Sequence, residues 1–163
     1  RYAKFNQSKS NITSGGAGTM GFALPAAIGA KYGAPKRTVV AIIGDGGFQM
    51  TLCELSTAFV NKLPVKVLIV DNKYLGMVRQ WQELFFDNRL SGVDLEGNPD
   101  FVKLAEAYGI KAFHITKVEH CNEIMKQAME YKGPCVIHAE VIKEDNVFPM
   151  VPQGCGVAEI RLK

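Results

Sequence analysis

The sequence predicts an α/β fold in three layers, α/β/α, built on a mostly parallel β-sheet. Two continuous runs of β-branched and apolar residues, 38–43 and 65–70, are typical of parallel strands that are covered on both faces. Each run is followed by a segment with helical spacing of apolar residues, 50–61 and 75–88. Because strands that alternate with helices form βαβ units, this order predicts one parallel sheet.

The second half of the chain continues the alternation. Residues 98–109 predict a helix with Asn98 at the N-cap, Pro99 in the first turn and Gly109 at the end. The remaining elements are expected at helix 18–33, strand 111–116, helix 120–131 and strand 134–142. We therefore expect residues 1–163 to form a single domain.

Composition narrows the class of protein. With 47% hydrophobic and 21% charged residues, the chain has the usage of an ordinary globular domain. Its net charge of +3 is dispersed along the chain, which gives no support for a nucleic-acid partner. No apolar stretch reaches the roughly 18 residues that a membrane span requires. The N-terminus has neither a starting Met nor the apolar core of a signal peptide, so we expect a fragment of a longer protein.

The cysteines and histidines show no metal-binding or disulfide pattern. Cys53, Cys121, Cys135 and Cys155 form no CxxC pair, and we expect buried, reduced thiols in the cytoplasm. His114 and His138 fall on predicted strands, where packing or edge positions are more common than catalytic ones.

The stretch VVAIIGDGGFQM, residues 39–50, ends an apolar run by placing Asp45 among three glycines. Ligands of open α/β sheets collect at the carboxyl ends of the strands, and glycines there let backbone amides approach an anion such as phosphate. A carboxylate beside a phosphate is repulsive unless a divalent cation lies between them. Asp45 therefore suggests a Mg²⁺ ion held against a phosphate.

Asn72 is the candidate for a second ligand. It follows the strand 65–70 by two residues, as Asp45 follows the end of the preceding strand at Ile43. Neighbouring strands lie about 4.8 Å apart, so the two side chains would converge if these strands are paired. The spacing leaves open that both residues are ordinary turn formers.

These residues resemble a known family. GDG with Asn72 at the end of the next strand is similar to the diphosphate-binding motif of thiamine diphosphate enzymes, and residues 14–30 resemble the segment that precedes it. The stretches DNKYLGMVRQWQ (71–82) and NVFPMVPQG (146–154) are similar to the acetolactate (acetohydroxyacid) synthase large subunit. The resemblance implies the thiamine diphosphate-binding fold and the C-terminal domain of a longer, three-domain subunit.

The resemblance also implies the cofactor contacts. Asp45, the Asn72 side chain and the Tyr74 carbonyl would bind Mg²⁺, and Met20 would hold thiamine diphosphate in its bent shape. The implied cofactor-binding set is Gly18, Met20, Gly44, Asp45, Gly46, Gly47, Asn72, Tyr74, Leu75, Gly76 and Met77. One departure is Asp71, where the family often has Asn, which places an extra negative charge beside the metal.

Met77, Val78 and Trp81 share one face of the predicted helix 75–88. An apolar stripe of this kind is more often part of a core. The resemblance instead implies that these residues border the active site, and that Trp81 helps select the second 2-keto acid.

The implied activity is the decarboxylating condensation of pyruvate with pyruvate or 2-ketobutyrate, in branched-chain amino-acid biosynthesis. The activating glutamate and most FAD contacts would lie outside this chain, so we expect no catalytic residue here and no activity of the fragment alone. A homo-oligomer, dimer or tetramer, and a small regulatory subunit are the implied partners.

Three alternatives remain open from the sequence. Another thiamine diphosphate-dependent decarboxylase, carboligase or oxidase would share the diphosphate motif. A nucleotide-binding Rossmann domain would use Gly16, Gly18 and Gly21, which match GxGxxG but follow a polar segment. A receiver-type regulatory module would accept phosphate on Asp45.

Overall fold

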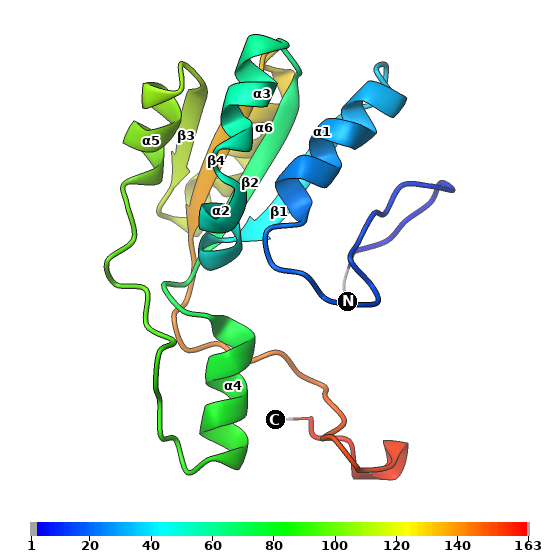
Figure 1. The fold of residues 1–163 in the computed structure, drawn as a ribbon, viewed down its shortest axis with the longest axis vertical. Helices are drawn as coiled ribbons and strands as arrows, with labels where there is room; N and C mark the ends of the chain where they lie inside the picture. The colour runs from blue at the N-terminus through cyan, green and yellow to red at the C-terminus, as the bar shows by residue number, and fades with distance from the viewer. Residues whose placement is uncertain (1–2, 163) are drawn as a thin grey trace.

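The computed structural model describes residues 3–162 (Figure 1). Within this range four strands form one sheet in the order β1-β2-β4-β3, and every neighbouring pair is parallel. The strands are β1 (Val39–Gly44), β2 (Val65–Asp71), β3 (Lys111–Ile115) and β4 (Cys135–Glu140). The predicted parallel sheet is therefore confirmed.

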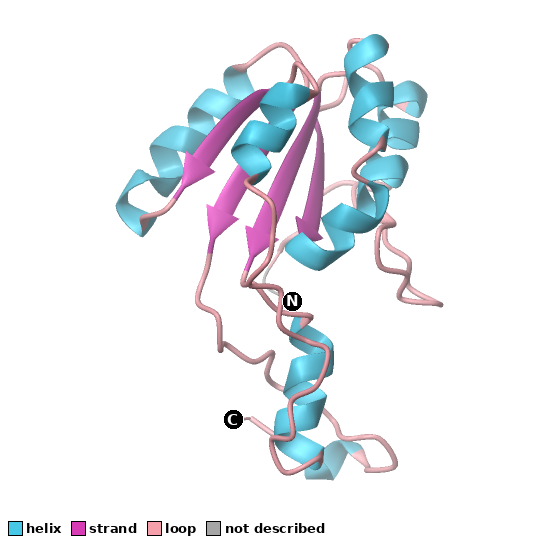
Figure 2. Ribbon diagram, turned by 60° about the vertical axis from the view of Figure 1, so that its left-hand side comes forward, coloured by secondary structure: helices cyan, strands magenta, loops and turns pink. Residues whose placement is uncertain are grey.

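Helices cover both faces of the sheet, as the three-layer prediction requires (Figures 1 and 2). One face carries α1 (Ala23–Gly33), α2 (Asp45–Thr51), α3 (Glu54–Val60) and α5 (Phe101–Ala107), and the other carries α6 (Cys121–Glu130). The helix α4 (Gly76–Phe85) projects beyond the carboxyl ends of the strands (Figure 1). Two 3₁₀ turns, η1 (Val118–His120) and η2 (Val157–Glu159), complete the order.

The larger part of the core lies between the sheet and the helices of the first face. Phe48 of α2 and Phe101 of α5 are fully buried there and meet edge to face at 5.6 Å between ring centroids. On the opposite face α6 packs over β3 and β4, and Ile42 of β1 is 66% exposed. The expectation that residues 38–43 are covered on both faces is therefore wrong for this strand.

Two predicted helix boundaries are also wrong, for reasons of backbone conformation. The first helix begins at Ala23 rather than residue 18, because Gly18 and Gly21 adopt φ values of +61° and +81° that lie outside a right-handed helix. The helix expected at 50–61 begins at Asp45 and is interrupted between α2 and α3.

The helix expected at 98–109 is α5, and its N-cap is Asp100 rather than Asn98. The Asp100 side chain accepts hydrogen bonds from the backbone amides of Val102 and Lys103. Gly109, at φ +72°, ends the segment as predicted. Asn98 is consequently available to contact residues elsewhere.

The four cysteines are unpaired, as predicted, but they are not all buried. Cys135 is buried, Cys121 and Cys155 are half-buried, and Cys53 is exposed. Within residues 3–162 no helix combines the length and the apolar character that a membrane crossing requires.

Lys66 is a buried cation within β2. Its side chain crosses to the C-terminal end of α6, where Nζ donates to the carbonyl oxygens of Tyr131 (2.6 Å) and Gly133 (2.8 Å). Burial lowers the pKa of this ammonium group. Lys66 thus joins the central strand to the turn that follows the helix of the second layer.

We predict that Lys66→Met destabilises the fold by about 2 kcal/mol, because the two carbonyl groups lose their donor while the apolar stem is kept. The measurement is the free energy of unfolding in urea. Lys126→Met on the exposed side of α6 is the control and should change it by less than about 0.5 kcal/mol. Equal effects of the two substitutions would contradict the role of Lys66.

Candidate functional site

An open cleft of about 1360 Å³ lies at the carboxyl ends of the strands. Its walls come from the segment before α1, the first turn of α2, the loop between β2 and α4, and the residues after β3 and β4. This is the edge at which ligands of open α/β sheets bind. The predicted site residues that line the cleft are Gly18, Met20, Gly44, Asp45, Gly46, Gly47, Asn72, Tyr74, Leu75, Gly76, Met77 and Val78.

Trp81 is placed differently. Its ring packs against Phe85 of the same helix at 5.2 Å between centroids, and it does not belong to the cleft lining found among residues 3–162. Met77 and Val78, one turn earlier on α4, are exposed and do line the cleft. The role of Trp81 in substrate selection stays a prediction.

Strand register decides which side chain meets Asp45. The last pair between β1 and β2 is Gly44 with Val70, so the next residues on the two strands are Asp45 and Asp71. These two carboxyl groups are 1% and 4% exposed. The register therefore sets Asp71 directly beside Asp45, and Asn72 follows one residue later. The binding of one metal ion by Asp45 and Asn72 stays a prediction.

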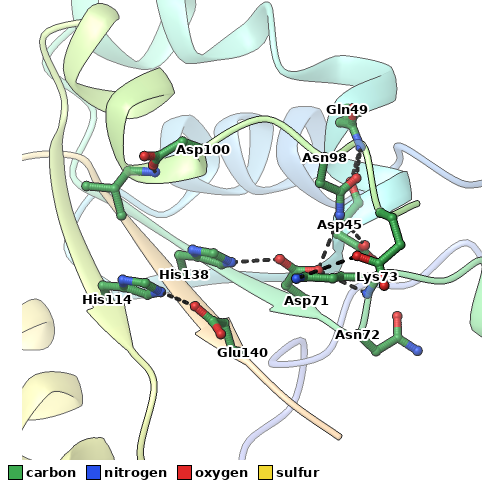
Figure 3. Close-up of polar contacts among 12 residues, drawn as sticks. Asp45, Gln49, Asp71, Asn72, Lys73, Asn98, Asp100, His114, His138 and Glu140 are labelled. Carbon is green, nitrogen blue, oxygen red and sulfur yellow. Dashed lines mark hydrogen bonds and ion pairs between the residues drawn. The ribbon is translucent and has the colours of Figure 1, made fainter. Parts of the chain in front are cut away.

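Asn72 lines the same cleft but is turned away from the carboxyl pair (Figure 3). Its Oδ1 accepts a hydrogen bond from the Tyr74 amide at 3.2 Å, which holds the loop in a tight turn. Gly76 makes room for this side chain, since a Cβ at Gly76 would lie 3.1 Å from Asn72 Nδ2.

The two carboxyl groups differ in proton affinity. Burial raises the pKa of Asp45, and the neighbouring Asp71 adds to the rise although a hydrogen bond from Asn98 opposes it. Burial acts in the same sense on Asp71, but hydrogen bonds with His138, Asp45 and the Lys73 amide together lower its pKa. Negative charge therefore concentrates on Asp71, and the pair as a whole presents oxygen ligands that suit a hard divalent cation.

Asn98 and His138 hold this pair from two sides (Figure 3). Asn98 Nδ2 donates to Asp45 Oδ2 at 2.7 Å and to Asp71 Oδ1 at 3.3 Å. His138 Nε2 lies 2.8 Å from Asp71 Oδ2. Neither residue was predicted for the site, because only the pairing of strands and loops distant in sequence brings them there.

The two histidines pack against each other, in line with the prediction, and each also contacts a carboxyl group. His138 stacks on His114 with centroids 4.7 Å apart and planes 4° from parallel, and Phe101 meets it edge-on. His114 Nε2 lies 2.7 Å from Glu140 Oε1. The nitrogen and oxygen atoms of His114, His138 and Glu140 lie within 4.8 Å of one another, but parallel rings cannot both direct a lone pair at one ion without rotating.

Gly46 is closely packed by side chains from other segments. A Cβ there would lie 2.7 Å from Leu75 Cδ2, 3.1 Å from Leu95 Cδ1 and 3.6 Å from Met20 Cε, so a side chain at this position would have to displace the ends of these side chains. Gly46 and Gly47 belong to the first turn of α2, where backbone amides have no partner within the helix. These amides can therefore bind an anion in the cleft.

The structure argues against two of the three sequence alternatives. Gly16 and Gly18 lie in turns that no strand precedes within residues 3–162, which contradicts the dinucleotide-binding interpretation. The ammonium group of Lys73 lies 4.0 Å from exposed Glu96, so it is paired away from the carboxyl pair that a receiver-type module would place beside a lysine.

We predict that His138→Ala lowers the free energy of unfolding by about 3 kcal/mol, because the buried Asp71 Oδ2 loses the contact that His138 makes to it. His114→Ala removes a half-exposed pair and should cost less than about 1 kcal/mol. Urea unfolding of both variants checks this. If the two variants lose the same free energy of unfolding, the His138–Asp71 contact contributes no more to stability than the His114–Glu140 contact.

Comparison with known proteins points to one family. The family model described as "Thiamine pyrophosphate enzyme, C-terminal TPP binding domain" matches residues 1–139. The chain is 46% identical over 149 residues to the acetolactate synthase isozyme 2 large subunit of Escherichia coli K12, covering 91% of this chain and 27% of that protein. It is 49% identical over 148 residues to the mitochondrial acetolactate synthase catalytic subunit of Saccharomyces cerevisiae, covering 91% of this chain and 21% of that protein.

A third relative, the acetolactate synthase large subunit of Porphyra purpurea, is 44% identical over 155 residues, which are 94% of this chain and 26% of that protein. The chain thus spans about a quarter of the length of the curated relatives that it matches. The fold, the cleft and the matched family model lead to one conclusion: the chain belongs to the family of C-terminal, thiamine pyrophosphate-binding domains of thiamine pyrophosphate enzymes.

Proposed function

We propose that the chain is the cofactor-binding domain of an acetolactate synthase large subunit. The observation that carries the proposal is the buried Asp45, set at the end of β1 in a cleft that also contains Asn72, Tyr74 and the first-turn glycines of α2. The similarity to three acetolactate synthases over nearly the whole chain supports it.

The residues fit Mg²⁺ and thiamine diphosphate. A carboxylate, a carboxamide oxygen and a backbone carbonyl are hard oxygen donors, which Mg²⁺ prefers. Burial and the neighbouring Asp71 raise the pKa of Asp45. A cation bound in place of the proton would compensate the negative charge of the two carboxylates. Gly46 and Gly47 lie in the cleft lining at the first turn of α2, where their amides can donate to a diphosphate.

Each residue then has a role. Asp45, Asn72 Oδ1 and the Tyr74 carbonyl would bind Mg²⁺, while Gly46 and Gly47 would donate to the diphosphate. Thiamine diphosphate, when bound, supplies the nucleophilic carbon and the electron sink for decarboxylating a 2-keto acid.

The pyrimidine and thiazolium end would lie near the segment before α1. Gly18, whose backbone at φ +61° favours glycine, would accept from the pyrimidine amino group through its carbonyl. The Met20 side chain reaches toward Gly46, where a flexible thioether can support the ring system.

The substrates in this proposal are small 2-keto acids. Met77 and Val78 present exposed apolar groups to the cleft from α4, and Trp81 follows on the same helix. They would contact the second substrate, pyruvate or 2-ketobutyrate, in a condensation that belongs to branched-chain amino-acid biosynthesis.

The rest of the enzyme is part of the same proposal. The relatives are about four times as long as the matched segment, which leaves room for two further domains that would supply the activating glutamate and the FAD contacts. Residues 1–163 would then be the C-terminal domain of a subunit that forms a dimer or tetramer and binds a small regulatory subunit. The unpaired cysteines support a reducing compartment, and we propose the cytoplasm.

We predict that Asp45→Asn in the intact subunit weakens the binding of thiamine diphosphate with Mg²⁺ by at least about 100-fold, because a charged ligand of the metal is lost. The measurements are calorimetric titration of the cofactor and acetolactate formed from pyruvate. Asp87→Asn, at an exposed position just after the end of α4, is the matched control and should behave as the wild type.

Two results would contradict the proposal. Binding by Asp45→Asn with wild-type affinity would remove Asp45 from the metal site. A wild-type enzyme that consumes pyruvate without forming acetolactate would be a different thiamine diphosphate-dependent decarboxylase or oxidase.

A further inference from the structure

Asn98 touches both buried carboxyl groups of the site from a separate part of the chain. It lies in the segment between α4 and α5, and its Nδ2 donates to Asp45 Oδ2 at 2.7 Å and to Asp71 Oδ1 at 3.3 Å. A carboxamide has two N–H donors, so one group can serve both oxygens. Asn98 thereby connects the ends of β1 and β2 on the side of the pair opposite to His138 (Figure 3).

The orientation of this carboxamide is fixed by a second side chain. Gln49 Nε2 donates to Asn98 Oδ1 at 2.8 Å, which leaves Nδ2 to face the carboxyl groups. Gln49 lies one helical turn after Asp45 on α2. Gln49 Nε2 also lies 3.5 Å from the backbone carbonyl oxygen of Asp45. Gln49, Asn98 and Asp45 therefore form a closed set of contacts that limits the rotation of the Gln49 and Asn98 side chains.

The backbone of the segment is joined to the loop that follows β2. The Leu75 amide donates to the Val93 carbonyl at 2.9 Å, and the Leu95 amide donates to the Lys73 carbonyl at 2.8 Å. The Asn98 amide in turn donates to the Leu95 carbonyl at 2.9 Å. Asn98 is thus carried by a segment that is paired with the loop containing Asn72 and Tyr74.

Helix capping does not explain Asn98, because Asp100 caps α5. Its contacts are instead to the carboxyl group that the proposed function assigns to the metal. A hydrogen bond to Oδ2 leaves the other oxygen of Asp45 available for a cation and limits the rotation of the carboxyl group.

We propose that Asn98 is a positioning residue for the metal ligand Asp45. This inference rests on the proposed function, since it requires a divalent cation at Asp45. Groups that orient a ligand from outside the coordination shell typically change metal affinity by 10- to 100-fold. Asn98 makes the orientation of Asp45 independent of whether the cation is bound.

The test compares Asn98→Ala with Asp100→Ala in the intact subunit. Asp100→Ala weakens the N-terminus of α5 two residues away but removes no contact to Asp45, so it controls for loss of local structure. The readouts are the dissociation constant of Mn²⁺ in the presence of thiamine diphosphate, followed by electron paramagnetic resonance, and the melting temperature. A third readout is the KM for pyruvate.

We expect Asn98→Ala to weaken Mn²⁺ binding by about 10- to 100-fold and to leave the KM for pyruvate at saturating metal unchanged. Asp100→Ala should bind Mn²⁺ with wild-type affinity, even if its melting temperature falls by as much as that of Asn98→Ala. Gln49→Ala keeps Asn98 but frees its rotation, and should weaken Mn²⁺ binding less than Asn98→Ala does. It provides the test if Asn98→Ala fails to fold.

An Asn98→Ala dissociation constant within twofold of the wild type would overturn the inference, as would an equal loss in Asp100→Ala. If Asn98→Ala fails to fold, wild-type Mn²⁺ binding by Gln49→Ala would overturn it. A wild-type subunit that binds no Mn²⁺ with thiamine diphosphate would instead overturn the proposed function, and this inference with it.

Discussion

The parallel pairing of β1 with β2 is the constraint on which the site depends. Both strands end at the same edge, and their register places Asp45 next to Asp71 where neither carboxyl group reaches bulk water. Two adjacent buried carboxyl groups are unfavourable unless protons, donors or cations compensate them. The surrounding residues provide this compensation. The N-terminus of α2 and the open cleft lie on one side of the pair, and Asn98 and His138 contact the carboxyl groups directly.

The partners come from parts of the chain that are far apart in sequence, so the site depends on the complete sheet. His138 is on β4, Asn98 precedes α5, and Gln49 is on α2. The order β1-β2-β4-β3 places β4 directly beside β2, which lets His138 reach Asp71. A change in strand order or register would separate these groups and leave the carboxyl pair without compensation.

The sequence was sufficient for the fold class because β-branched runs and helical spacing are local properties. An acid among glycines at the end of a buried strand is typical of a ligand site, and the structure places Asp45 buried in the cleft lining, while its role as a metal ligand stays a prediction. The contact of Asp45 with Asp71 is not predictable in the same way, because register depends on pairing between strands rather than on distance from a strand end. Asn98 was interpreted as a helix cap because Asn and Asp are both good caps, and only the structure shows that Asp100 takes that position. Exposure of Ile42 was not predictable, since it depends on where α6 lies.

The central claim is that one cation is shared by the end of β1 and the loop after β2. The most direct measurement is a crystal structure of the intact subunit with Mn²⁺ and thiamine diphosphate, in which anomalous scattering locates the ion. We expect one peak with the Asp45 carboxylate, Asn72 Oδ1 and the Tyr74 carbonyl each about 2.1 Å away, as for Mg²⁺. A peak bound by Asp71 without Asn72, or one elsewhere in the cleft, would contradict the account.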